Sequence, residues 1–423
     1  MKDSDVIVVG GGPCGSFAAL NLAKLGIEVN VFEEHSDVGV PCHCAGHLSI
    51  GGLRLLGLYP LPAKIVENTF RGATIHSPSG EQFRIRFSSA ITCAVNRVLF
   101  DKHIASSAKN AGANYFLDSK VESLIVNNGS VKGVVVKHGN NEEKFLAKIV
   151  VDAEGASARI LRQSGLVAFN SRDVAKGVQA HAEGLEGLET NMVDVFLGRH
   201  YAPGLYGWLM PTGDGKAKIG LATKTGNPRQ LLKRLMHRHP NASKKLEKAK
   251  ISKVSYHPIP LGGPIARTFS NGLLVVGDAA AQVKPTTGGG VIYGMNCART
   301  AAKVVSDALQ SDNFSSEFLN IYQKRWKEKL GLEFAFMVRM RKMFDSLDDR
   351  RIDDLIGFCT RIGLDKAFQK SHNVDFQRRE LVRMLWNPRI SLSGLYLLLL
   401  ISSCNRKNLM YHAFVKDGFK END

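Results

Sequence analysis

The first residues that could do chemistry are three glycines, Gly10, Gly12 and Gly15, which directly follow the apolar run 5–9. Gly10 permits a tight turn, Gly12 lets the backbone approach a pyrophosphate, and Gly15 lets the next helix pack closely on the strand. The free N–H groups at the start of that helix would face the phosphates. The spacing predicts a dinucleotide-binding turn, whose cofactor residues are Gly10, Gly12, Pro13, Cys14 and Gly15.

Two acids end the next strand-like run, where such a site needs a carboxylate. Glu33, followed by Glu34, lies about 20 residues beyond the glycines and can accept hydrogen bonds from an adenosine ribose. A glutamate here would repel the 2′-phosphate of NADP, so the pattern disfavours that cofactor. The alternative is a strand–helix–strand unit that binds nothing.

Two more turns of this kind occur far along the chain. One strand-like run leads into Glu154 and Gly155, and a later one ends in Gly277 and Asp278. Asp278 can bind the ribityl hydroxyls of a flavin, and a glycine run at a helix start can bring N–H groups to the flavin ring. That run comprises Gly288, Gly289, Gly290 and Val291. One strand–helix–strand unit cannot hold a whole flavin adenine dinucleotide, so the three turns together predict FAD.

A loop over 40–47 holds two cysteines and two histidines. It lacks the Cys-x-x-Cys spacing of zinc knuckles, and no second cysteine pair completes a shell, so we predict no metal site. We expect instead that this loop lines the cofactor and brings a thiol close to the chemistry.

The nucleotide-binding motifs lie on both sides of a β-rich segment in the sequence. We therefore predict a nucleotide-binding domain into which a second, β-rich domain is inserted. The predicted fold class is α/β with an α+β insertion: a Rossmann-like FAD-binding domain, an antiparallel β-sheet substrate domain and C-terminal helices. We expect helices over 16–25, 96–112 and 291–309 and a β-meander over 121–151. The predicted domains are FAD-binding at 1–70, 91–165 and 262–310, substrate-binding at 71–90 and 166–261, and helical at 311–423.

Charge and cysteine usage bear on partners and location. The chain has 423 residues, a net charge of +17 and seven cysteines without disulfide spacing, which predicts a reducing, cytoplasmic setting. Over 229–253, nine Lys or Arg accompany one acid, with leucines at helical spacing. The pattern predicts a basic amphipathic helix that Pro240 breaks or kinks. Two explanations of this charge stay open: a solvated helix face, and peripheral docking on an anionic membrane. No nucleic-acid motif accompanies the charge, so nucleic-acid binding is disfavoured.

The most apolar stretch of the chain is 395–401. It is far shorter than the roughly 20 residues that cross a bilayer. It therefore predicts either a core helix or an interfacial patch.

The ordered motifs resemble the aromatic-hydroxylase type of flavoprotein and, within it, the geranylgeranyl reductase family. The stretch 203–211, PGLYGWLMP, is similar to that family's P-x-x-Y-x-W-x-F-P motif, with Met210 in place of Phe. The resemblance implies that Tyr206 and Trp208 line the pocket where a prenyl chain meets the flavin. It also implies that the cysteine loop lies beside the flavin ring and that Arg97 opens a supporting helix. The further cofactor residues are Cys44, Ala45, Gly46, Arg97 and Val121, while Glu154 departs from the aspartate usual in relatives.

The implied reaction is hydride transfer from reduced flavin to an isolated carbon–carbon double bond. A proton must also be delivered, and Cys44 and Tyr206 are the candidate acids. The predicted catalytic residues are Cys44, Tyr206 and Trp208. The implied partners are a prenylated lipid or prenyl diphosphate and an electron donor, either NAD(P)H or a ferredoxin-like protein.

Two other functions stay open at this point. One is a flavin monooxygenase or halogenase of the same fold, because Tyr206–Pro211 faintly resembles a Trp-x-Trp-x-Ile-Pro stretch of some halogenases. The other is a membrane-associated flavoprotein that carries electrons, although the chain lacks a cysteine-rich iron–sulfur segment.

Overall fold

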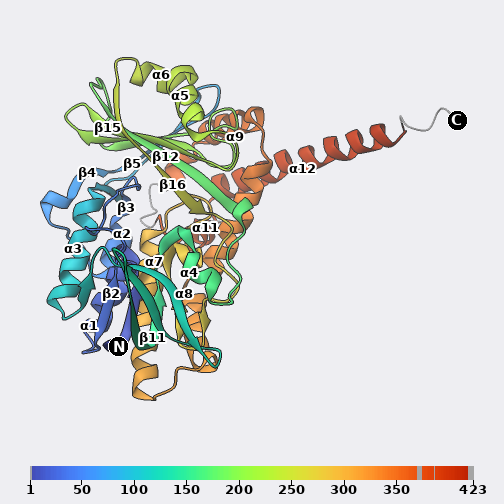
Figure 1. Ribbon diagram of the computed structural model, residues 1–423. Coiled ribbons are helices and arrows are strands. Elements are labelled where there is room, and N and C mark those ends of the chain that lie inside the picture. Colours follow the sequence, from blue (N-terminus) through green and yellow to red (C-terminus); the bar gives the residue numbers. More distant parts are fainter. Residues whose placement is uncertain (1, 369–373, 385, 418–423) are drawn as a thin grey trace. The chain divides into compact units, whose positions relative to one another are not determined.

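A computed structural model of the chain describes residues 2–368, 374–384 and 386–417 (Figure 1). The chain forms two compact units, each made of separated segments. Unit 1 comprises Met1–Thr69, Thr92–Gln179 and Ser255–Val338, and unit 2 comprises Phe70–Ile91, Ala180–Val254 and Arg339–Asp423. The predicted mixed α/β fold, with helices and several sheets, is confirmed.

An eight-stranded sheet forms the centre of unit 1, in the order β17-β18-β11-β1-β2-β8, with β10 and β9 added through β11. β1 pairs in parallel with β2 and β11, β11 with β18, and β2 with β8. The meander β9-β10-β11 is antiparallel, as predicted. The strands are β1 (Lys2–Val9), β2 (Val29–Phe32), β8 (Asn114–Phe116), β9 (Lys120–Asn127), β10 (Ser130–His138), β11 (Asn141–Asp152), β17 (Phe269–Ser270) and β18 (Leu273–Val275).

The second half of β1 (Lys2–Val9) is apolar on both faces because it is enclosed in the core. Val6, Ile7 and Val8 are fully buried, and Val9 is nearly so. Helix α1 (Pro13–Ala23) packs against α3 (Arg97–Asn110) and α7 (Val291–Gln310). The predicted helices over 16–25, 96–112 and 291–309 are thus confirmed to within a few residues at each end.

Smaller elements complete unit 1. A three-stranded sheet has the order β3-β7-β4, and the Ser49 side chain caps α2 by accepting the N–H of Gly52 at 2.6 Å. These elements are β3 (His47–Ser49), α2 (Ile50–Leu56), β4 (Val66–Phe70), β7 (Thr92–Val95) and α4 (Arg159–Gln163).

A seven-stranded sheet organises unit 2, in the order β16-β12-β15-β14-β13-β5-β6. Neighbours β5–β6, β13–β14 and β14–β15 are antiparallel as predicted, whereas β13 and β5 pair in parallel. A long connection separates β5 from β13 along the chain, and such a crossover permits parallel pairing. The strands are β5 (Gly72–His76), β6 (Gln82–Arg86), β12 (Val174–Glu183), β13 (Met192–Phe196), β14 (Gly207–Gly213), β15 (Lys216–Thr223) and β16 (Lys250–Pro260).

The predicted basic amphipathic segment forms α5 (Pro228–Arg238) and α6 (Pro240–Leu246), with the predicted break before Pro240. Its apolar side is part of the core, because Leu231, Leu232, Leu235 and Met236 are all buried. A Cβ on Gly207 would lie 2.5 Å from Leu235 Cδ2, so the helix packs directly on β14. The apolar face is therefore not free to enter a bilayer, and the basic face remains as a solvated surface.

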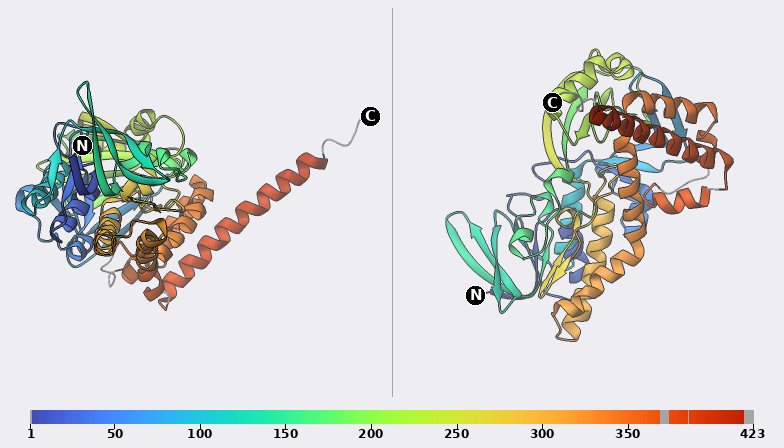
Figure 2. Two further views of the ribbon diagram at one scale, coloured as in Figure 1. Left: turned by 60° about the horizontal axis from the view of Figure 1, so that its bottom comes forward. Right: turned by 90° about the vertical axis from the view of Figure 1, so that its right-hand side faces the viewer.

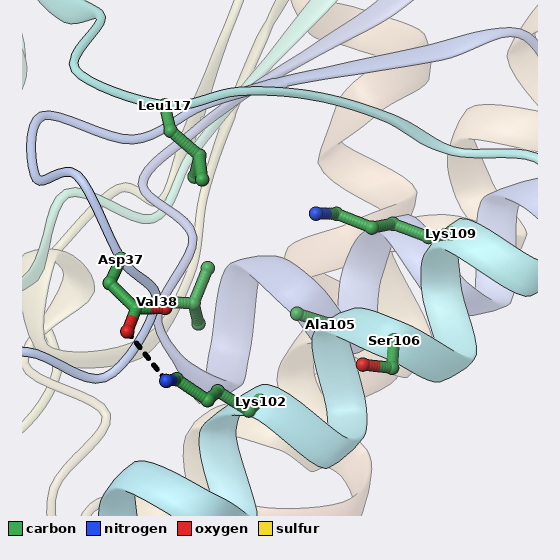
Figure 3. A pocket seen from close by; sticks show the side chains of 7 residues that line it. All are labelled: Asp37, Val38, Lys102, Ala105, Ser106, Lys109 and Leu117. Carbon is green, nitrogen blue, oxygen red and sulfur yellow. Dashed lines mark ion pairs between the residues drawn. The ribbon is translucent and has the colours of Figure 1, made fainter.

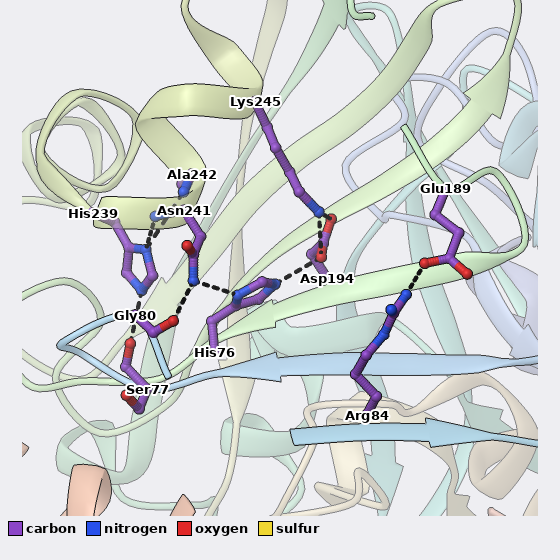
Figure 4. A network of polar contacts seen from close by, with 10 residues as sticks. All are labelled: His76, Ser77, Gly80, Arg84, Glu189, Asp194, His239, Asn241, Ala242 and Lys245. Carbon is purple, nitrogen blue, oxygen red and sulfur yellow. Dashed lines mark hydrogen bonds and ion pairs between the residues drawn. The ribbon is translucent and has the colours of Figure 1, made fainter. Parts of the chain in front are cut away.

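A buried polar network fastens α6 to the sheet of unit 2 (Figure 4). The fully buried His76 lies 2.7 Å from Asp194 Oδ1 through Nε2, and its Nδ1 accepts from the Asn241 amide at 2.9 Å. Lys245 Nζ contacts both Asp194 oxygens, at 2.7 and 2.6 Å. His239 accepts the N–H groups of Asn241 and Ala242 on Nδ1, so its Nε2–H donates to the carbonyl of Ser77 at 3.1 Å. The two N–H groups that Nδ1 of His239 accepts hold this ring in its neutral form.

This network predicts a loss of stability in acid. Burial, and secondarily His76, lowers the pKa of His239 to about 4. Between its ordinary pKa and about 4, the unfolded chain takes up a proton on this ring and the folded chain does not, so stability falls as pH falls. His239→Asn keeps a capping acceptor and cannot titrate. Between neutral pH and pH ~4, we expect the free energy of unfolding to fall by up to about 3 kcal/mol more in the wild type than in this variant. Urea titration at each pH measures the difference. An equal loss in both proteins would contradict this role.

Helices follow the last strand. The sequence predicted one helical region over 311–423, whereas the units divide this range after Val338. The physical reason is α8 (Ser316–Ser346), whose first half belongs to the core of unit 1: Tyr322 donates to the Val275 carbonyl at 3.0 Å, and Trp326 Nε1 donates to Thr268 Oγ1 at 3.1 Å. The remaining helices are α9 (Asp349–Arg361), α10 (Asp365–Phe368), α11 (Gln377–Met384) and α12 (Pro388–Asp417).

Figure 2 shows α12 as one long helix that extends beyond α9 and α11. Among the described residues, no single helix is both long and apolar enough to cross a membrane. One pair, Gln377–Met384 with Pro388–Ser402, reaches the required length and apolarity together, and its two helices are bent by 114°.

Candidate active site

The predicted glycine turn joins β1 to α1 and is closed by backbone contacts that leave no space for side chains. A Cβ on Gly15 would lie 2.0 Å from the carbonyl oxygen of Gly10, and one on Gly10 would lie 2.6 Å from that of Ala153. A Cβ on Gly12, in contrast, would meet nothing within 4 Å. No side chain caps α1 at Gly12, so its first N–H groups are available to an anion.

Glu33 is fixed beside this turn. Its Oε2 accepts the N–H of Gly11 at 2.7 Å, and its Oε1 accepts the N–H of His35 at 3.1 Å and lies 2.6 Å from His35 Nδ1. A carboxylate has about four acceptor positions, so room remains for ribose hydroxyls. Its neighbour Glu34 is exposed.

The three predicted turns come together in unit 1. The first meets the second where Gly10 lies against Ala153 and Glu154. The first turn meets the third through Cys14. A Cβ on Gly277 would lie 3.0 Å from Cys14 Sγ, and a Cβ on Gly294 would lie 2.4 Å from the same sulfur. The Cys14 thiol is therefore a packing group between α1 and α7, and burial raises its pKa well above the ordinary value.

The third turn places a carboxylate at the start of α7. A Cβ on Gly290 would lie 2.7 Å from Asp278 Oδ1, and no side chain caps α7 there. Gly288, Gly289 and Gly290 precede Val291, the first residue of the helix. The turn thus combines one carboxylate with uncapped N–H groups, the two features that were expected to hold the flavin half of the cofactor.

The second turn uses its acids internally. Glu154 caps α4 by accepting the N–H groups of Arg159 and Leu161, both at 2.8 Å. The fully buried Asp152 accepts the N–H of Glu154 through Oδ1, and its Oδ2 has no partner within the described ranges. Burial, and then the Glu154 charge, raises the pKa of Asp152 well above the usual range. Only the backbone here, notably Gly155 with open space around its Cα, remains for a cofactor.

Val121 and Arg97 support the site from two other elements. Arg159 Nη2 donates to the Val121 carbonyl at 2.6 Å, which ties β9 to the second turn. Arg97, the first residue of α3, makes a buried bidentate pair with Asp101 at 3.0 and 2.9 Å. Arg97 is thus a fixed cation at the base of the cysteine loop.

The cysteine loop packs on the start of α3. A Cβ on Gly46 would lie 2.3 Å from the Val95 carbonyl and 3.2 Å from Arg97 Cγ. Cys44 Sγ accepts the N–H of Gly46 at 3.5 Å. Burial alone would lower the pKa of Arg97, but Asp101 and then Cys44 outweigh it and raise the pKa. The Cys44–Ala45–Gly46 segment therefore packs against Arg97, at the start of α3.

Two histidines that the sequence did not single out as site residues link this loop to the third turn. His257 Nε2 lies 3.6 Å from Asp278 Oδ2, and the ring of His257 stacks on that of His43 with centroids 6.2 Å apart. Burial, and then His257, lowers the pKa of His43. No local sequence signal could have paired them, because more than two hundred residues separate the two histidines.

Tyr206 and Trp208 lie in unit 2, at the start of β14. Their rings are 6.2 Å apart at 69°, an edge-on pair. Burial raises the pKa of Tyr206 to about 12, and Arg341 opposes this in part. The Nε1 of Trp208 is buried and makes no hydrogen bond within the part of the chain that the structure describes. An unpaired buried N–H is costly, which is typical of a site that a ligand completes.

A small cleft of about 190 Å³ opens beside α3 (Figure 3). Val38 and Leu117 line it, and Lys102 pairs with Asp37 at its edge at 2.5 Å. None of the predicted site residues lines this cleft. The converging turns, not this cleft, therefore define the candidate site. Across 2–368, 374–384 and 386–417, no group of three His, Cys, Asp or Glu could hold a metal ion.

Comparison with known proteins gives consistent relatives. The family model described as "Lycopene cyclase protein" matches residues 5–356. Digeranylgeranylglycerophospholipid reductase 2 of Methanothermobacter thermautotrophicus is 32% identical over 360 residues, covering 83% of this chain and 90% of that protein. The corresponding reductase of Methanocaldococcus jannaschii is 32% identical over 354 residues, covering 83% and 89%.

Solved structures agree. A geranylgeranyl bacteriochlorophyll reductase-like protein of Thermoplasma acidophilum superposes with a TM-score of 0.83 at 26% identity, covering 94% of this chain and all of that one. A flavin-dependent brominase superposes with a TM-score of 0.71 over 96% of this chain and all of its own, and at 19% identity it shows a shared fold only. From the relatives' identity and coverage, the chain belongs to the geranylgeranyl reductase family, as its motifs predicted.

Proposed function

We propose that this protein is an FAD-dependent oxidoreductase that saturates isolated double bonds in the geranylgeranyl chains of a glycerophospholipid. One structural observation carries the proposal: three glycine-flanked turns from distant parts of the chain meet within unit 1 and leave two helix N-termini without side-chain caps. The substrate class follows from the named reductases that this chain resembles. The halogenase-type alternative has only a shared fold in its favour.

The residues present fit FAD. The open space beside Gly12 and the uncapped start of α1 suit a pyrophosphate, and Glu33 suits the adenosine ribose. Asp278 and the start of α7 suit the ribityl chain and the flavin ring. When bound and reduced, FAD would supply a hydride.

The chain itself must supply a proton to the second carbon of each double bond. The phenol of Tyr206, with a pKa of about 12, holds its proton tightly. Cysteine thiols ordinarily ionise near pH ~8.5, so a thiol is the better acid. We therefore propose that Cys44 Sγ donates the proton, while Tyr206 and Trp208 line the pocket, orient the prenyl chain and exclude water.

His257 is proposed as a positioning residue. Its contact with Asp278 and its stacking on His43 tie the third turn to the cysteine loop. We expect His257→Gln to lower kcat with a smaller effect on KM, because it loosens the loop that carries Cys44. Flavin content and a kcat-against-KM comparison measure this, and an unchanged kcat would contradict it.

A direct test uses the flavin-loaded full chain. The protein is reduced chemically without oxygen and mixed with a digeranylgeranylglycerophospholipid in detergent micelles. We expect the lipid mass to rise by two hydrogen atoms for each saturated bond. Unchanged lipid mass without oxygen, together with fast turnover once oxygen is admitted, would instead support a monooxygenase or halogenase activity.

The remaining partners are part of the same proposal. Electrons come from transiently bound NAD(P)H or from a ferredoxin-like protein, which anaerobic titration of the bound flavin with each donor would distinguish. The net charge of +17 supports peripheral association with anionic membranes, where the lipid substrate resides.

A further inference from the structure

The first turns of α12 are fastened to unit 2 along one face only. Ile390 and Leu397 are 3% and 8% exposed, and Tyr396 stacks on Phe358 of α9 with ring centroids 4.2 Å apart. Ile390 belongs to a small core that also contains Ile356. This face therefore fixes the rotation of the helix about its own axis.

The opposite face carries an unpartnered apolar stripe. Leu392, Leu395 and Leu399 are 49%, 56% and 59% exposed, at i, i+3 and i+7 spacing, and Leu398 beside them is 53% exposed. We call these four residues the leucine stripe. Four exposed leucines on one helix face exceed the scattered single apolar residues that are normal on a protein surface.

Aromatic and basic residues border the leucine stripe. Trp386, in the bend between α11 and α12, is 95% exposed. Arg379, Arg383 and Arg389 are exposed on either side of it. Of the two acids within 374–402, Asp375 is buried, while Glu380 pairs with Arg383 at 3.3 Å. The surface around the bend is therefore apolar with a positive border.

We propose that the leucine stripe and Trp386 dock on the surface of an anionic lipid bilayer. Leucines enter the acyl boundary, tryptophan lies at headgroup level, and arginines pair with lipid phosphates. A second copy of the chain would bring the same arginines against one another, whereas anionic headgroups neutralise them. The charge thus favours lipid over self-association. The proposal rests on the proposed function, since the lipid substrate would then be drawn from this bilayer.

The test compares full-length variants by sedimentation with phosphatidylcholine vesicles, with and without phosphatidylglycerol. Each leucine moved from lipid to water weakens binding about ten-fold, so we expect Leu395→Gln/Leu399→Gln to bind anionic vesicles about 100-fold more weakly. Added salt should weaken wild-type binding. Leu332→Gln is the matched control, because Leu332 is 65% exposed on α8 and lies outside the stripe. It should bind like the wild type.

Three outcomes would overturn the proposal. The first is that Leu332→Gln loses as much vesicle binding as the double variant, and the second is that wild-type binding does not depend on lipid charge or salt. The third is that light scattering shows the wild type as a dimer and the double variant as a monomer. Turnover in detergent micelles separates this proposal from the proposed function. If docking is right, the double variant saturates micellar substrate at the wild-type rate but fails on vesicles. If the wild type saturates no lipid in micelles, the proposed function fails, whatever the vesicle result.

Discussion

Replacing Gly12 with alanine is expected to remove FAD from the protein without changing the stability of the fold. Gly12 has φ −64° and ψ −177°, which alanine adopts freely, and its added methyl group would meet no protein atom within 4 Å. The methyl group would occupy the space that a pyrophosphate needs. Losing close approach to two charged hydrogen bonds costs about 3 kcal/mol, or about 100-fold in Kd. Flavin fluorescence titration and thermal unfolding of the apoprotein measure the two effects.

Two controls bracket this prediction. Gly15→Ala should destabilise the apoprotein itself by about 3 kcal/mol, because its methyl group would lie 2.0 Å from the Gly10 carbonyl. Gly51→Ala, in α2 with its nearest neighbour at 3.8 Å, should bind FAD like the wild type. Normal FAD affinity in Gly12→Ala would mean that this turn does not hold the pyrophosphate.

Replacing Cys44 with alanine is expected to lower the rate of alkene saturation by about 100-fold or more, with flavin still bound. The variant removes the proposed proton donor but leaves Arg97 and its pair with Asp101 in place. Stopped-flow reoxidation of the reduced protein by the lipid measures the rate.

Neighbouring variants make this result specific. Cys42→Ala removes an exposed thiol two residues away and should keep the wild-type rate. Tyr206→Phe should reduce the rate less than Cys44→Ala, because a phenol with a pKa of about 12 is a poor acid. A larger loss of rate in Tyr206→Phe than in Cys44→Ala would assign the proton to the phenol instead.

The parts of the site that the sequence could predict are those set by local rules. The spacing of Gly10, Gly12 and Gly15 after an apolar run determines a strand, a turn and a helix without help from distant residues. Glu33 and Asp278 follow from the same rule, because each comes at the end of a buried strand, β2 or the run through β18. The order of these turns was enough to infer that they converge, and Cys14 shows them in contact through its packing on Gly277.

What the sequence missed depends on contacts between distant segments. The stacking of His43 on His257 depends on how two separate segments meet. The parallel pairing of β5 with β13 depends on the path of a long crossover. The apolar side of α5 could equally have met lipid or sheet, since both bury leucine, and only the tertiary structure assigns Leu235 to the core. Helical periodicity shows which face of a helix is apolar, but not whether that face packs on protein or on lipid.

The strand order of unit 1 also constrains how the protein is made. β18, one of the last strands in the chain, pairs with β11 near the middle of the sheet, and α7 follows it. A nascent chain that stops before β18 leaves the last three residues of β11, Val150–Asp152, without their strand partner. Unpaired strand edges of this kind are templates for aggregation. Such distant pairings also slow folding. The nucleotide site therefore does not form from the N-terminal segment alone. A truncated chain would expose unpaired, aggregation-prone strands and would not form a nucleotide-binding domain.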